Sequence, residues 1–62
     1  MNVATARAQI LAKSTTNADL IDAIADSEIQ VDGVGNVLAP NPQGVYTNLA
    51  DADLINFALA LP

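Results

Sequence analysis

The chain is 62 residues long, and seven acidic residues against two basic ones give it a formal net charge of −5. It contains no cysteine and no histidine, which excludes disulfides, thiolate nucleophiles, imidazole bases and the ordinary zinc and iron–sulfur sites. The length allows one small domain over residues 1–62, and two basic side chains cannot form a surface that follows nucleic-acid phosphates.

The first predicted element is a helix over about residues 2–13. Val3, Ala6 and Ile10 fall near helical spacing, and the Ala, Arg, Gln and Lys residues among them favour helix. The polar run 14–17 then predicts a break and the start of a second helix.

The second helix is expected over about residues 17–27. Thr16, with Asp19 three residues later, resembles a capping box in which the shorter aspartate replaces glutamate. Helical spacing places three aspartates of this segment on one face: Asp19, Asp22 and Asp26. We interpret this acidic face as solvated, because acid–base catalysis by paired carboxylates also needs a substrate cleft, which so short a chain cannot build.

The middle of the chain reads as a short β-hairpin near residues 29–38. Residues 28–31 alternate polar and apolar, and the turn dipeptides Asp32-Gly33 and Gly35-Asn36 follow. The two glycines lack the third glycine, the lysine and the following helix of a phosphate-binding loop, so a hairpin turn is the better interpretation. Residues 39–44, with two prolines, predict a loop, and 44–47 a short third strand.

The last helix is expected over about residues 48–61, with Thr47 or Asn48 as its N-cap. After Asp53 it is apolar on nearly every side, and a helix of this kind is buried on every side. So short a domain can cover only part of it, so we expect part of this helix to contact another chain. The candidate partner-binding residues are Leu54, Phe57, Leu59 and Leu61.

Two further motifs near the start of this helix allow sharper interpretations. Asp51-x-Asp53 resembles the beginning of a calcium loop, but the required glycine and glutamate are replaced by Asn56 and Pro62. We therefore predict no metal site there. The six residues 51–56 also resemble 17–22. Shared helix-capping chemistry explains this similarity most simply, and a duplicated docking motif is the alternative.

These observations predict a small, mainly α, α+β domain with three short helices and a hairpin. It would act by binding protein surfaces, without catalysis, cofactor, metal or membrane insertion, because its longest apolar run is far shorter than a bilayer-spanning helix. The favoured role is a small subunit of a large assembly, such as a cement, decoration, minor capsid, neck or tail component of a phage or virus particle. The alternative is an acidic, DNA-mimicking inhibitor or adaptor that occupies a basic groove on an enzyme. The first role would place the chain in a virion and the second in the cytoplasm.

Overall fold

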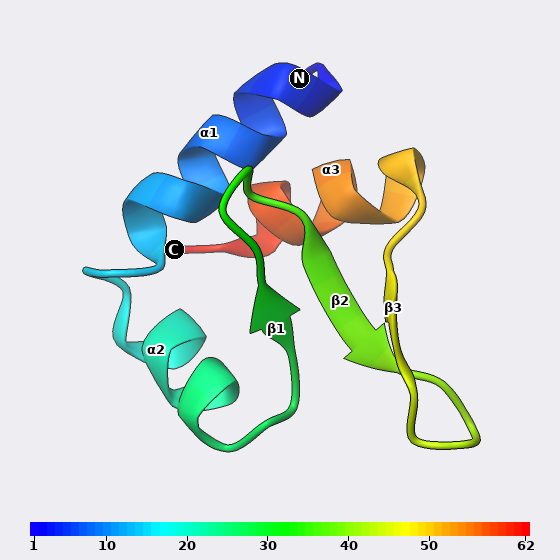
Figure 1. Ribbon diagram of the computed structural model, residues 1–62. Coiled ribbons are helices and arrows are strands. Elements are labelled where there is room, and N and C mark those ends of the chain that lie inside the picture. The colour runs from blue at the N-terminus through cyan, green and yellow to red at the C-terminus, as the bar shows by residue number, and fades with distance from the viewer.

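In the computed structural model, which describes residues 1–62, three helices pack beside a three-stranded antiparallel sheet and leave the outer side of β3 uncovered (Figure 1). The predicted α+β class with mainly α content is therefore confirmed. The helices are α1 (Val3–Lys13), α2 (Ala18–Ala25) and α3 (Asp51–Ala60). The strands are β1 (Gln30–Val31), β2 (Val37–Pro40) and β3 (Tyr46–Asn48).

The sheet has the order β1-β2-β3, so β2 is central and the other two strands are edges. Val31 pairs with Val37 across the first hairpin, and Ala39 pairs with Thr47 across the second. The hairpin near 29–38 and the short third strand are thus both present. The predicted loop 39–44 is partly wrong, because residues 39 and 40 continue β2 and the turn covers 41–45. Proline is tolerated at position 40 because it ends the strand.

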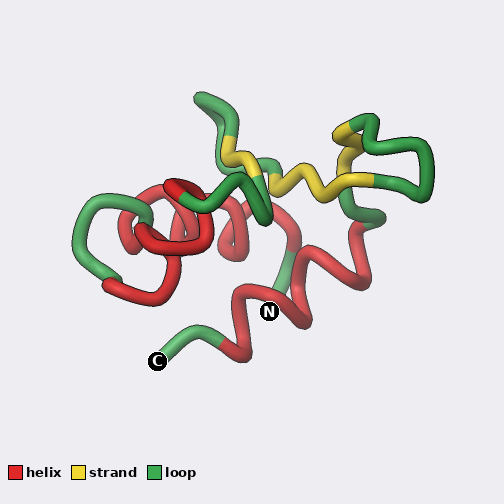
Figure 2. The backbone as a smooth tube through the Cα atoms, turned by 90° about the horizontal axis from the view of Figure 1, so that it is seen from below, coloured by secondary structure: helices red, strands yellow, loops and turns green.

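The core lies where α1 and α3 meet the sheet. Figure 2 shows the strands on one side of α3, and α1 packs against α3. Five side chains from α1, β2 and α3 form one fully buried cluster: Ala6, Ile10, Val37, Leu54 and Ala58. Leu20 of α2 is buried outside this cluster, so only six apolar side chains in the chain are fully buried.

The ends of two helices differ from the prediction. Asn17 caps α2, with its Oδ1 accepting from Leu20 N at 3.0 Å, whereas the Thr16 hydroxyl donates backwards to Ala12 O. The prediction of a capping box at Thr16 and Asp19 is therefore wrong. Thr47 and Asn48 do not cap α3, because they belong to β3, and α3 starts after Ala50 without a side-chain cap. Two aspartates in its first turn instead stabilise the helix, because their negative charges lie near the positive end of the helix dipole.

The end of the chain is tied to the α1–α2 junction. Lys13 Nζ donates to the carbonyl of Leu61 at 3.5 Å, and Asn17 Nδ2 donates to that of Pro62 at 3.2 Å. Asn17 therefore caps α2 and holds the residues after α3 with the same side chain. No helix of the structure is long and apolar enough to cross a bilayer.

Candidate interaction surfaces

The four residues predicted to bind a partner lie in different environments. Leu54 is 1% exposed and belongs to the core, so the fold itself covers it. Phe57 and Leu61 are half-buried and pack against the core cluster. Leu59 is 61% exposed and has the largest exposed fraction among the large apolar side chains. Of the predicted set, Leu59 alone is exposed.

Leu59 lies on the exposed face of α3, beyond the two aspartates of its first turn. At 3.6 residues per turn, the exposed residues on the side of α3 opposite Leu54 and Ala58 form what we call the outer α3 face. Its members are Ala52, Asp53, Asn56, Leu59 and Ala60. The two aspartates of the helix stand at its first turn, so most of this face combines one leucine with small or neutral neighbours. A partner helix could approach it closely, because interaxial distance is set by side-chain size at the contact.

The three aspartates of the predicted acidic face lie on and just after α2. Asp19, Asp22 and Asp26 are all exposed and share one side of the helix, on the side away from buried Leu20. Ile21, on the apolar side of the helix, is 40% exposed. No group of three or more acidic side chains in the structure is arranged to hold a metal ion, and there is no cavity. The chemistry that this face offers is a negative surface potential.

The turn 32–36 is held by one carboxylate. Asp32 Oδ1 accepts from the backbone N of Val34 at 3.0 Å and of Asn36 at 2.9 Å, and Oδ2 accepts from Asn36 Nδ2 at 3.0 Å. The side chain of Asn36, followed by the backbone donors, lowers the pKa of Asp32 below its usual value. These bonds satisfy the carboxylate within the turn, so the predicted hairpin turn is confirmed.

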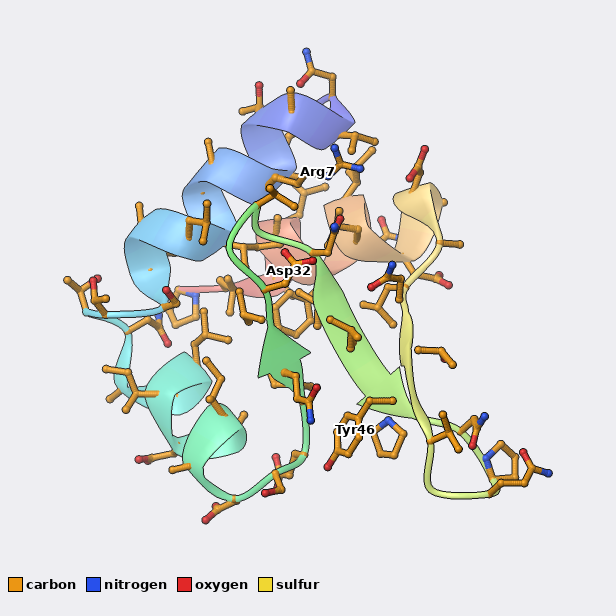
Figure 3. The ribbon with its side chains drawn as sticks, in the orientation of Figure 1. Arg7, Asp32 and Tyr46 are labelled. Carbon is orange, nitrogen blue, oxygen red and sulfur yellow. The ribbon has the colours of Figure 1, made fainter.

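The same turn is pressed against α1 (Figure 3). Gly35 is buried, with φ at +89°, and a Cβ added there would lie 2.3 Å from the carbonyl oxygen of Arg7. Arg7 Nε is buried without a hydrogen-bond partner. Elsewhere on the sheet, the Tyr46 hydroxyl donates to the carbonyl of Ser27, whose φ is +60°. This contact joins β3 to the segment that follows α2.

Sequence reasoning missed two exposed valines. Val34 at the first turn is 59% exposed and Val45 at the second is 57% exposed. The signal was present, because each lies next to a glycine in a turn sequence, where a side chain has few neighbours to cover it. Val45 directly precedes β3 and therefore continues the edge of the sheet.

Searches of protein-family models, curated proteins and solved structures find no match to this chain.

Proposed function

We propose that this chain is a small non-enzymatic subunit of a larger protein assembly and that it docks through the outer α3 face. The observation that carries the proposal is Leu59, 61% exposed on an otherwise neutral part of a helix. Covering a leucine contributes roughly 1.5–3 kcal/mol. Small neighbours allow a partner to cover it without desolvating charged groups.

The size of the core supports the same conclusion. Six fully buried apolar side chains are few for 62 residues, and no disulfide exists to reinforce them. Domains of this size bury a small fraction of their surface and are marginally stable without metals, disulfides or association. A partner on the outer α3 face would cover Leu59, the apolar surface of this helix that the core leaves most exposed.

Within this class, a component of a phage or virus particle fits best: a cement or decoration subunit, or a minor capsid, neck or tail piece. Such subunits need shape and adhesion rather than reactive groups. The short helices and exposed alanines of this chain supply a compact body with closely approachable faces.

Photo-crosslinking in the native complex tests the docking surface. A benzoyl-phenylalanine at position 59 should crosslink to a neighbouring subunit, whereas the same group at position 34 should not. Val34 is the matched control because it is equally exposed, at 59%, but lies on a turn rather than on α3. Absence of crosslinks from position 59, or equal crosslinks from both positions, would contradict the proposal.

A second candidate function is an acidic inhibitor or adaptor. The observation that favours it is the exposed row of three aspartates on α2. A basic groove on an enzyme could accept this face as it accepts nucleic-acid phosphates. Salt separates the two functions, because ion pairing across exposed surfaces is screened and apolar docking is not. A steep loss of partner affinity with added salt supports the acidic face, and indifference supports α3.

A further inference from the structure

We propose that the free edge of β3 pairs with the same edge of a second copy of this chain, in antiparallel orientation, about a two-fold axis at Thr47. β3 is the last strand of the sheet, and Figure 1 shows it with no strand on its outer side. This surface is separate from the outer α3 face, so its success or failure does not depend on the proposed docking function.

The hydrogen-bond pattern defines what the edge offers. Asn41 N donates to Val45 O, and Leu49 N donates to Val37 O, both at 2.9 Å. In an antiparallel ladder, peptide groups point alternately toward and away from the neighbouring strand. The backbone N–H and C=O groups of residues 45, 47 and 49 therefore face β2. Those of Tyr46 and Asn48 point away from the sheet. The free edge presents two donors and two acceptors.

These groups are complementary to themselves. Tyr46 and Asn48 lie symmetrically on either side of Thr47, so a two-fold axis at Thr47 places Tyr46 opposite Asn48 of the second copy, and the reverse. Both are then hydrogen-bonded pairs, which gives four backbone hydrogen bonds. A shift of the register by one residue is excluded because it would bring inward-pointing groups to the interface.

The same register also covers the exposed valine. Val45 comes to lie opposite Leu49 of the second copy, on the same face of the extended sheet, and the symmetry repeats this contact. Val45 is 57% exposed and Leu49 is half-buried in a single copy. Directly opposed apolar side chains contact each other and stabilise a pair of strands. The pairing therefore explains why a turn residue next to the edge is a β-branched apolar one.

Charge does not protect this edge. Edge strands are usually kept apart by charged side chains, proline or bulges, but residues 43–50 carry no charge and no proline. The nearest acid, Asp51, would lie level with Gln43 of the second copy rather than with another acid. The other edge differs, since β1 has two residues and lies between Glu28 and Asp32. Because β3 has only three residues, the interface falls below the ~1,200 Å² of stable complexes, and we expect weak association.

Charge substitution at the two-fold axis tests the register. Sedimentation equilibrium from micromolar to millimolar concentration should show wild-type dimers that strengthen with salt, since each copy carries −5. Thr47→Lys and Thr47→Glu each place like charges opposite each other and should weaken association about two- to fivefold. An equimolar mixture of the two variants should restore it. The Thr47 side chain is exposed, so both variants keep the fold. The same substitutions at exposed Gln30 of β1 are the matched control and should show no recovery on mixing.

A backbone substitution provides an independent test. Asn48→Pro removes an outward N–H while leaving the bonds to β2 intact, so circular dichroism should stay unchanged and association should be lost. A wild-type chain that remains monomeric at millimolar concentration overturns the proposal. So does a dimer that is indifferent to both Thr47 variants, which would place another surface at the interface, or a mixture that shows no recovery.

Discussion

The two hairpin turns of this molecule have the same internal structure in opposite surroundings. We call residues 32–36 the first turn and 41–45 the second. In each, the first residue's N–H donates to the fifth residue's carbonyl (3.1 and 2.9 Å), and the fourth residue's N–H donates back to the first residue's carbonyl (3.2 and 2.8 Å). In each, a side-chain Oδ1 accepts from the backbone of the third and fifth residues. Both have a glycine with positive φ at the fourth position.

The surroundings divide them. Gly35 of the first turn is buried against the backbone of Arg7, whereas a Cβ on Gly44 of the second turn would meet nothing within 4 Å. The first turn begins with an ionisable aspartate and the second with a neutral asparagine. One turn therefore joins the sheet to α1, and the other ends a free hairpin. The two turns have the same local geometry, but we expect them to contribute differently to the free energy of unfolding. Substitutions can measure this difference.

The largest effect is expected for Gly35→Ala. The new methyl group would lie 2.3 Å from Arg7 O and 2.9 Å from Arg7 Cα, and it would also force alanine into a left-handed conformation. Overpacking costs about 1–3 kcal/mol and left-handed strain about 1–2 kcal/mol. We expect a loss of about 2–5 kcal/mol in the free energy of unfolding, measured by urea denaturation. A loss below that of Gly44→Ala would show that the turn does not press on α1.

Gly44→Ala should lower the free energy of unfolding by less, about 1–2 kcal/mol. The positive φ of +81° is strained for alanine, but the added methyl group would meet no other atom within 4 Å. The difference between the two alanine variants isolates the contact with α1, since their backbone conformations are alike. Urea denaturation on both, with the m-value checked for constancy, gives this difference directly. Equal losses would assign the whole effect to backbone strain.

Acidic pH should remove stability contributed by the first turn, because that turn holds the ionised carboxylate of Asp32. Its pKa is lowered in the folded chain by Asn36 and by the backbone donors of the turn, so the folded state favours the ionised form relative to an unfolded aspartate, at about 3.9. This contribution is fully present above the unfolded pKa and is lost as pH falls through the folded pKa. Thermal melts between pH 5 and pH 2 (roughly the window in which aspartates titrate) should show a smaller loss for Asp32→Asn than for wild type. Equal losses would mean that this carboxylate is not stabilised by the turn.

A substitution can make the stability contributed by the second turn depend on acidic pH in the same way. Asn41→Asp keeps an oxygen that accepts from residues 43 and 45, so the new aspartate should also have a lowered pKa and add an acid-dependent loss of stability. The effect should be smaller than for Asp32, because Val45 replaces Asn36 and supplies no side-chain donor. The double variant Asn41→Asp with Val45→Asn should enlarge it. Melts over the same pH range check both.

Much of the fold follows from local sequence. Helical spacing and turn dipeptides placed three helices and the first hairpin, because these signals act within a few residues. The predicted ends were less accurate. Asn48 looked like a cap for α3 but lies in β3 opposite Leu38, because the residues on either side of it bond to β2 across the sheet. Long-range pairing of this kind leaves no local signal.

The repeated six residues show the same limit. Asn17 caps α2 through its side chain, whereas Asp51, in the corresponding position, already lies inside α3. Shared capping chemistry therefore does not hold at this level of detail. For the candidate site, apolar spacing identified α3 as over-apolar but could not separate buried Leu54 from exposed Leu59. That separation depends on which side of the helix meets α1 and the sheet, which only the packed fold determines.

The smallest effect is expected for Gly33→Ala, which completes the comparison. Gly33 lies in the first turn, but its φ is not positive and a Cβ would meet nothing within 4 Å. Alanine also has fewer unfolded conformations to lose, so this variant should be neutral or more stable by about 0.4–1 kcal/mol. Urea denaturation beside Gly35→Ala separates the two glycines of one turn. If Gly33→Ala lowered the free energy of unfolding as much as Gly35→Ala, the first turn would require glycine at both positions. The contact with Arg7 would then not explain the effect of Gly35→Ala.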